Sequence, residues 1–250
     1  MATVRVDTSE LVKLRERFAK MREQLPFATA QALTQTAQAG QAAVRQEMTR
    51  VFDRPTPYIL DSTFIKPATK TNLEAHVYLK DIAGKAIAPA KAIGHEVTGG
   101  GRAWKRSEGA LRNAGLMGAN ENAVPGQAAK LDAYGNMDRG QIIQIIAYFQ
   151  AFGEQGYKAN TTRSKRDKLA KGTKAKGGMR YFLKRDGRGR GIYMSEQSFG
   201  RWSMRPVLMF VRRAQYQRRL DMQRVVQDVA RAQFGAWFAD SWAQATRSAR

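Results

Sequence analysis

The sequence has no cysteine and only two histidines among its 250 residues. Disulfide bonds and thiolate metal ligands are therefore excluded, and the usual zinc sites of His and Cys cannot form. The lack of cysteine fits a reducing compartment or assembly inside a cell. No run approaches the roughly 18 consecutive apolar residues of a membrane helix, and the N-terminus lacks the layout of a signal peptide. We therefore expect a soluble intracellular component that does not bind membranes.

Signatures of catalysis are also missing. There is no GxSxG elbow and no Walker A loop, and GGGR at residues 99–102 lacks the spaced glycine, lysine and hydroxyl of a phosphate loop. His95 and Glu96 are not followed by the second histidine of an HExxH motif. We predict no enzyme, no catalytic residue, no cofactor and no bound metal. A magnesium-dependent nuclease or lytic enzyme remains a weaker alternative, for which only scattered carboxylates are available: Glu96, Glu108, Asp132 and Asp138.

Positive charge is what the sequence has in excess. It contains 43 Lys and Arg against 21 Asp and Glu, a formal net charge of +22, which favours nucleic acid, another polyanion or acidic proteins as partners. Half of this excess lies in residues 158–190, where 13 Lys or Arg accompany two Asp. Glycine and polar residues there predict a basic loop and hairpin insertion over residues 156–191, with strands at 181–183 and 192–194.

The basic insertion has little aromatic interleaving in residues 158–180. This favours salt-sensitive contact with duplex phosphates over base stacking on single strands. A solvated loop without a partner is the alternative interpretation. The residues that we expect to contact DNA or an acidic partner are Lys165, Arg166, Lys168, Lys171, Lys174 and Lys176.

Helical periodicity is strongest at the two ends of the chain. Apolar residues recur at steps of three and four from about residue 8 to 53, which predicts two helices or one helix kinked at Pro26. A second stripe from Gln217 onward predicts a helix of about 30 residues, roughly 45 Å long. Its aromatic end, with Trp237 and Trp242, is typical of a core or a subunit interface.

The middle of the chain mixes short periodic segments with loops. Alternation predicts strands at 63–65 and 75–79, joined by a polar turn, and a buried strand at 207–211. Asp138 is positioned to cap a short, strongly apolar helix. Residues 94–137 contain nine glycines and neither helical nor strand period, so we expect an extended glycine-rich surface loop there.

Several motifs together resemble the tail and neck proteins of tailed bacteriophages, of the minor tail protein Z or tail-completion type. The resemblance covers most of the chain from residue 50 on, and its motifs are RPTP at 54–57, ATK at 68–70 followed by L-x-A-x-V, GGGRAWKRSEGALRNAG at 99–115, VPGQAAKLDAYGNM at 124–137 and RPVLMFVRRAQYQRRLDM near the C-terminus. It implies helices packed on a small antiparallel sheet. It also implies a non-enzymatic role, with copies arranged around the head-to-tail axis.

These observations together predict a single α+β domain over residues 1–250, with long N- and C-terminal helices packed on a small antiparallel sheet and large loop extensions. The expected partners are copies of the chain in a ring, phage portal or connector proteins, tail-tube or tail-terminator proteins, and the genomic DNA in the channel. We expect the protein in the tail or neck of the virion, after assembly in the host cytoplasm. The residues expected at the subunit interface are Gly99, Gly100, Arg102, Trp104, Trp237 and Trp242.

A stand-alone basic protein that binds nucleic acid is the alternative from a different class. The net charge favours it, whereas the sequence has no recognisable helix-turn-helix, zinc finger or aromatic RNA-binding signature. Salt separates the two hypotheses. A stand-alone binder should lose duplex affinity steeply as salt rises, and a ring subunit should associate without DNA.

Overall fold

The structure is a computed structural model that describes residues 9–84, 87–173, 177–185, 189–198, 201–213 and 215–248. It confirms an α+β fold with long terminal helices and small antiparallel sheets. Where the sequence predicts one domain, the chain divides into two compact units. We name Met1–Val97 with Arg218–Arg250 the helical unit, and Thr98–Gln217 the sheet unit.

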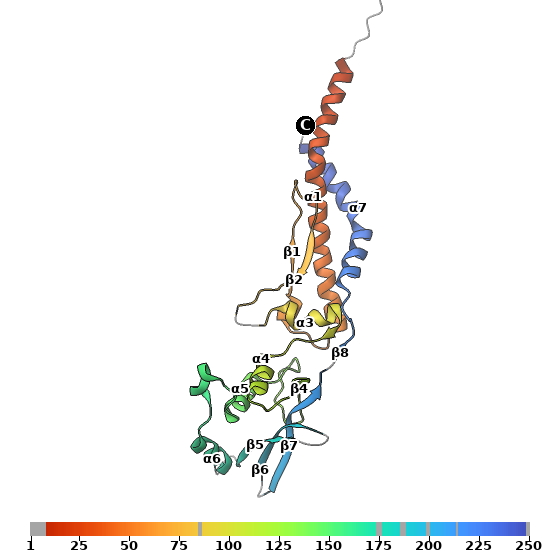
Figure 1. Ribbon diagram of the computed structural model, residues 1–250. Coiled ribbons are helices and arrows are strands. Elements are labelled where there is room, and N and C mark those ends of the chain that lie inside the picture. The colour runs from red at the N-terminus through yellow and green to blue at the C-terminus, as the bar shows by residue number, and fades with distance from the viewer. Residues whose placement is uncertain are drawn as a thin grey trace, which may run out of the picture. The chain divides into compact units, whose positions relative to one another are not determined.

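The helical unit is built on two long helices, α1 (Ser9–Val51) and α7 (Met222–Ser248). Helix α1 is one helix with Pro26 inside it, so the second of the two predicted arrangements lies closer to the structure. Helix α7 runs beside α1, and α1 extends beyond the C-terminal end of α7 (Figure 1). The helices approach closely at Gly40, where an added Cβ would lie 3.2 Å from Val226 Cγ1.

Shorter elements complete the helical unit at the C-terminal half of α1. Strands β1 (Thr63–Lys66) and β2 (His76–Leu79) form the antiparallel hairpin that alternation predicts, with Thr63 opposite Leu79. Helices α2 (Pro57–Leu60) and α3 (Pro89–Thr98) flank this hairpin in the chain. The buried core of this region consists of Val44, Met48, Ile93 and Leu220.

The sheet unit contains a four-stranded antiparallel sheet with the strand order β4-β7-β6-β5. Its strands are β4 (Glu121–Pro125), β5 (Met179–Lys184), β6 (Gly191–Ser198) and β7 (Arg201–Arg212). The predicted hairpin is confirmed as β5 and β6, and the predicted strand at 207–211 lies in the C-terminal half of the longer β7. A further pair joins β3 (Gly100–Gly101) to β8 (Gln215–Tyr216).

Helices cover one side of this sheet. Helices α4 (Arg106–Asn113) and α5 (Arg139–Tyr148) lie together on that side (Figure 1). Asp138 caps α5 as predicted, because its carboxylate accepts a hydrogen bond of 2.8 Å from the Gln141 N–H. The core between helices and sheet is apolar, and its fully buried members include Leu111, Ile145, Ile192 and Val207.

The prediction of an extended loop over residues 94–137 is wrong. Helix α4 and strand β4 occupy 13 of its positions, and the end of α3 occupies several more. The segment before α5 is also fixed by tertiary bonds. The Gln141 side chain accepts from the Lys130 N–H at 2.7 Å and donates to the Ala128 carbonyl at 3.2 Å. The glycines of this segment indicated its turns correctly, but their number led us to predict a loop where α4 and β4 lie between the turns.

The prediction of a flexible basic loop before the hairpin is wrong as well. Glu154–Ala159 forms a 3₁₀ turn, and Arg163–Lys171 forms helix α6. The Thr162 hydroxyl caps α6 by accepting from the Lys165 N–H at 3.3 Å. The density of like charge in this segment suggested a loop, but a capped nine-residue helix spreads the same charge around its surface.

Candidate functional site

Helix α6 brings four of the predicted contact residues onto one short element. Lys165, Lys168 and Lys171 are exposed, as expected for side chains that meet a polyanion. Arg166 is half-buried, and its guanidinium lies 6.0 Å from the centroid of the Tyr148 ring. Arg166 therefore helps attach the helix to the sheet unit. The other two predicted residues, Lys174 and Lys176, lie outside the described residues.

Helix α6 is attached to the edge of the sheet through close backbone contact. An added Cβ at Gly178, just before β5, would lie 1.9 Å from the carbonyl oxygen of Ala170. Leu169 and Ala170 are half-buried on the same side of the helix. The three exposed lysines are thus presented on a helix whose opposite side packs against the protein.

The predicted interface residues of the sheet unit lie at the β3–β8 pair and just after it. Gly99 and Gly100 have φ angles of 80° and 92°, a region that favours glycine. Trp104 is 40% exposed. The centroid of its ring lies 3.7 Å from the guanidinium carbon of Arg112 and 5.1 Å from that of Arg213. The indole therefore packs against two cations of its own chain, and part of its surface stays exposed to a partner.

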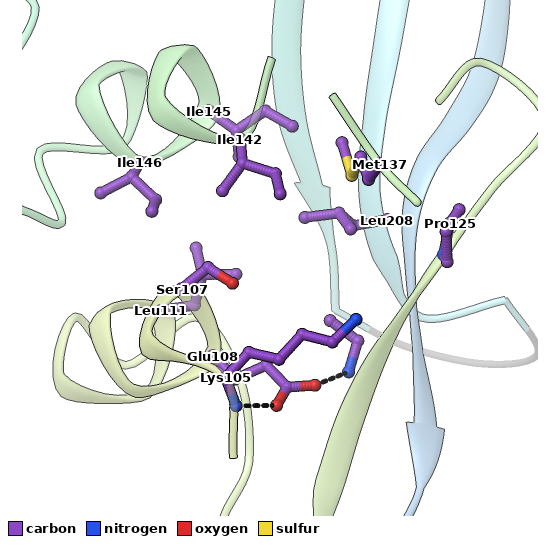
Figure 2. A pocket seen from close by; sticks show the side chains of 11 residues that line it. Lys105, Ser107, Glu108, Leu111, Pro125, Met137, Ile142, Ile145, Ile146 and Leu208 are labelled. Atoms are coloured by element: carbon purple, nitrogen blue, oxygen red, sulfur yellow. Dashed lines mark hydrogen bonds between the residues drawn. The ribbon is translucent and has the colours of Figure 1, made fainter. Parts of the chain in front are cut away.

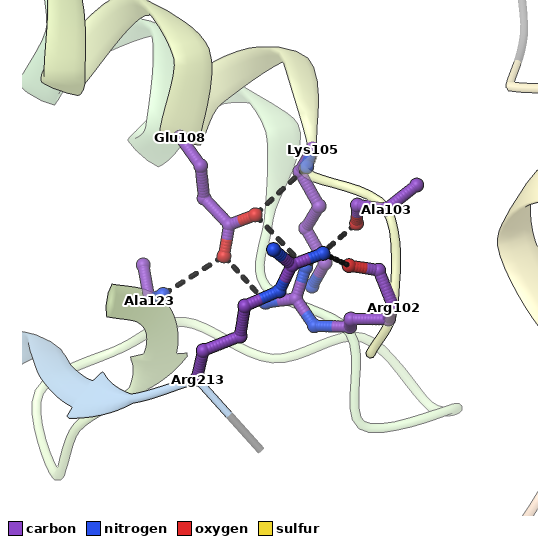
Figure 3. A network of polar contacts seen from close by, with 6 residues as sticks. All are labelled: Arg102, Ala103, Lys105, Glu108, Ala123 and Arg213. Atoms are coloured by element: carbon purple, nitrogen blue, oxygen red, sulfur yellow. Dashed lines mark hydrogen bonds and ion pairs between the residues drawn. The ribbon is translucent and has the colours of Figure 1, made fainter. Parts of the chain in front are cut away.

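Arg102, which we expected at a subunit interface, is mostly buried in a polar network (Figure 3). Its guanidinium donates to both carboxylate oxygens of Glu108, which is fully buried. The same carboxylate accepts from the Lys105 N–H at 2.7 Å and from the Ala123 N–H at 2.8 Å. Arg213 donates to the Arg102 carbonyl at 3.3 Å. The network ties α4 to β4 and to the segment after β3.

The charged groups of this network shift one another's pKa values. Burial alone would raise the pKa of Glu108, but the hydrogen bonds from Arg102 and two backbone N–H groups outweigh it and hold that pKa below its usual range. The bond to Glu108 raises the pKa of Arg102. Desolvation, followed by repulsion from Arg102, lowers the pKa of Lys105, although part of the Lys105 side chain is exposed. Glu108 therefore stays ionised and neutralises one of the three cations in this network, Arg102, Lys105 and Arg213.

An apolar pocket of about 30 Å³ lies between α4, α5 and the sheet (Figure 2). Leu111, Ile142, Ile146 and Leu208 are among its lining residues, and Lys105 and Glu108 contribute its polar wall. A cavity of this volume has room for one or two waters, whereas small-molecule sites enclose hundreds of Å³. The pocket is therefore a packing gap and not a substrate site.

The predicted aromatic end of α7 forms a stacked row along the helix. Phe234, Phe238 and Trp242 follow one another at four-residue steps, with ring centroids 6.1 Å and 6.4 Å apart. Trp237 and Trp242 are both half-buried. Both tryptophans therefore take part in packing and also present surface that a neighbour could cover.

The four carboxylates considered for magnesium have other structural roles or lie apart. Glu108 belongs to the network above, Asp138 caps α5, and Asp132 accepts from the backbone N–H groups of Tyr134 and Asn136. Within the described ranges, no three His, Cys, Asp or Glu side chains gather where they could hold a metal ion.

A surface that the sequence analysis missed lies on the side of the sheet opposite α4 and α5. We name this the exterior face and define it by the side chains of Arg180, Phe182, Tyr193, Trp202 and Met204. On β5 and β6, the first three alternate with the buried residues Tyr181, Ile192 and Met194. On β7, Met204 lies opposite Ser195 and Trp202 opposite Gln197, so the sheet register places both on the same face as Tyr193. The signal was the alternation in RWSMR at residues 201–205, but this run is short and the three strands are separated in the chain.

Comparison with known proteins adds no identification, because no protein-family model, curated protein or solved structure matches the chain. The resemblance to phage tail and neck proteins therefore stays a prediction. None of the helices in the described ranges has both the length and the apolar character needed to cross a membrane.

Proposed function

We propose that the chain is a structural virion protein of a tailed bacteriophage, located in the neck or tail, which forms or joins a ring around the DNA channel. In this role it performs no catalysis and needs no cofactor. Its partners would be copies of itself, the portal or connector, and tail-tube or tail-terminator proteins. The observation on which the proposal depends is the set of large apolar side chains exposed on the helical unit.

These exposed side chains lie on regular elements. On α1, Phe18 is 60% exposed, Leu25 45% and Phe27 39%. On the β1–β2 hairpin, Phe64 and Tyr78 are cross-strand neighbours, with ring centroids 5.3 Å apart, and each is about 40% exposed. Large apolar side chains that stay exposed on ordered elements are typical of surfaces that another protein covers.

A groove next to these residues adds a concave surface of the kind that receives a neighbouring chain. It has a volume of about 580 Å³ and lies between α1 and the segment after β1. Phe27, Thr34, Pro67 and Lys70 are among its lining residues, and Lys70 Nζ lies 5.1 Å from the centroid of the Phe27 ring. A shape of this kind suits head-to-tail association, in which one copy inserts part of its surface into the next.

The charge distribution supports a place near DNA or an acidic partner. The sheet unit contains 23 Lys and Arg against 8 Asp and Glu, so most of the chain's excess charge lies in this one unit. Lys165, Lys168 and Lys171 on α6 would line the channel or contact an acidic ring above or below.

The test is the mass of the purified chain in solution, measured by light scattering at two salt concentrations with and without duplex DNA. We expect discrete oligomers without DNA, or a monomer that enters rings when the portal and tail-tube proteins of its phage are added. A monomer that ignores these proteins, coats DNA at low salt and releases it at high salt would refute the virion role.

That second outcome would favour the alternative function, a stand-alone basic protein that binds nucleic acid, which the charge of the sheet unit also supports. A plasmid cleavage assay with added Mg²⁺ tests the third class. Metal-dependent cleavage by the purified chain would contradict the non-enzymatic proposal.

A further inference from the structure

The exterior face combines exposed aromatic and sulfur-containing side chains with cations. Trp202 is 48% exposed and Met204 is 70% exposed, whereas Phe182 and Tyr193 are half-buried beside them. The rings of Phe182 and Tyr193 stack, with centroids 5.8 Å apart and planes 27° apart. The folded chain thus leaves a large indole and a thioether in water on an ordered sheet, which is costly unless something covers them.

Cations lie close to two of the aromatic rings on this face. The Arg180 guanidinium lies 5.7 Å from the centroid of the Trp202 ring, and Lys184 Nζ lies 5.8 Å from that of Tyr193. Alternation places no carboxylate of β5, β6 or residues 201–205 on the same face. Glu196 lies on the opposite face, where it pairs with Arg205 at 2.9 Å. The exterior face is therefore positive as well as aromatic.

The backbone of β7 makes this surface accessible from the side. Strand β4 pairs with β7 only at Leu208–Arg212, so residues 201–205 have β6 on one side and no β4 residue opposite them on the other. All five of these residues are exposed. Trp202 and Met204 thus stand on an arm that projects beyond the core of the sheet unit, where a long flexible ligand can pass.

Rings and cations on an open sheet suit one class of ligand in particular. A single nucleic-acid strand offers unpaired bases, which stack on aromatic rings, and phosphates, which bind Arg and Lys. In a duplex the bases are paired and stacked on each other, so only its phosphates could bind this face, through the cations. An acidic polypeptide would satisfy the charges, but its Asp and Glu side chains have no aromatic ring to stack on Trp202.

We propose that the exterior face binds a single nucleic-acid strand, with bases stacked on Trp202 and on the Phe182–Tyr193 pair and phosphates held by Arg180 and Lys184. This inference does not rest on the virion role and extends the functional assignment beyond the lysines of α6. It also differs from the sequence analysis, which favoured duplex contact because residues 158–180 contain few aromatic residues. The rings that matter lie in the strands that follow.

The test uses the full chain and fluorescein-labelled oligonucleotides of about 15 nucleotides, a length within the range of known single-strand sites. Oligo-dT, oligo-U and a matched duplex are titrated and binding is read by anisotropy. Trp202→Ala should weaken binding of the two single strands about tenfold or more and leave duplex binding unchanged. Trp202→Phe should keep most of the affinity, because a ring remains. A difference between oligo-dT and oligo-U would tell DNA from RNA.

A matched control separates the exterior face from the α6 lysines. The double variant Lys168→Glu, Lys171→Glu should weaken single-strand and duplex binding by similar factors, since it removes charge without changing the rings. Trp202→Ala is at a half-exposed position, and its melting curve by circular dichroism checks that the sheet unit stays folded.

Two outcomes would overturn the proposal. One is oligo-dT and oligo-U affinity that Trp202→Ala leaves unchanged. The other is polyglutamate binding that depends on Trp202 when oligonucleotide binding does not, which would make the exterior face a docking surface for an acidic protein. Neither outcome bears on the oligomeric mass that tests the virion role, so the two proposals can fail separately.

Discussion

At the scale of single residues, Glu108 joins three parts of the sheet unit through one carboxylate. It is fully buried, pairs with Arg102 and accepts two backbone N–H groups, one of them from β4. Removal of its charge would leave Arg102 mostly buried and without its carboxylate partner. We therefore expect Glu108→Gln to lower the free energy of unfolding by about 3 kcal/mol, as measured by urea denaturation.

The control for this substitution is Asp53→Asn. Asp53 pairs with Arg54 at 3.1 Å, but its side chain is 81% exposed. Exposed pairs contribute little to stability, so this change should leave the free energy of unfolding almost unchanged. Equal effects of the two substitutions would show that the buried network is not specially stabilising.

Glu108 should also make stability depend on pH. Because the folded state holds the pKa of Glu108 below its usual range, its contribution is fully present above the unfolded pKa of about 4.3 and is lost as pH falls through the lower folded value. The melting temperature of the natural chain should therefore drop more steeply from pH 5 to pH 3 than that of Glu108→Gln. Parallel curves for the two proteins would contradict this assignment.

At the scale of elements, the contact of α1 with α7 depends on a glycine. An added Cβ at Gly40 would lie 3.2 Å from Val226, whereas Gly235 on α7 has nothing within 4 Å. Gly40→Leu should separate the helices and lower the free energy of unfolding by about 1–3 kcal/mol. Gly235→Leu should raise the free energy of unfolding by up to about 1 kcal/mol, because leucine has a higher helix propensity than glycine. Thermal unfolding followed at 222 nm measures both, and a stabilised Gly40→Leu variant would contradict the close approach.

The free part of β7 gives a prediction about strand register. The Pro206 carbonyl accepts from the Ala128 N–H at 2.8 Å, so residue 206 has its backbone groups on the side away from β6. Backbone groups of successive residues in a strand point to opposite sides. The Met204 N–H therefore points away from β6, and the Arg205 N–H points toward Met194 on β6. Met204→Pro should keep the sheet unit folded, and Arg205→Pro should destabilise it by about 3 kcal/mol. Hydrogen exchange of β6 amides distinguishes them, and the reverse order would mean a shifted register.

The elements that the sequence predicted well show their pattern within one continuous stretch. The long helices repeat their period many times, and the two short strands of the β1–β2 hairpin are recognised together because they alternate on either side of one polar turn. Helix α4 has eight residues and β4 has five, too few for a period to stand out. Both are held by bonds to Glu108, whose partners at Arg102 and Ala123 could be found only once the chain had folded.

At the scale of the whole molecule, the division into two units could not be predicted from the order of the chain. The helical unit combines both ends of the sequence, because α7 returns to pack along α1. The candidate surfaces also differ in whether their residues are neighbours in the sequence. Charge density indicated the lysines of α6, since they are neighbours in the sequence. The exterior face needs residues 180, 193 and 202 from three strands, and only sheet pairing brings them together.

The last prediction concerns the assembly of whole chains through α1. Phe18 and Leu25 are both exposed and are seven residues apart on α1, so they lie on one face of the helix. If neighbours cover this face, Phe18→Ser with Leu25→Ser should shift oligomers toward monomers, because each buried side chain contributes roughly 1.5–3 kcal/mol to association.

The matched control is Lys20→Ser with Glu23→Ser, which changes two exposed polar residues on the same helix. Light scattering, alone and with portal and tail-tube proteins added, gives the mass of each variant, and circular dichroism confirms that α1 is retained. Assembly that survives the apolar double substitution as well as it survives the control would remove α1 from the interface. The groove beside Phe27 and the Phe64–Tyr78 pair would then be the surfaces to substitute next.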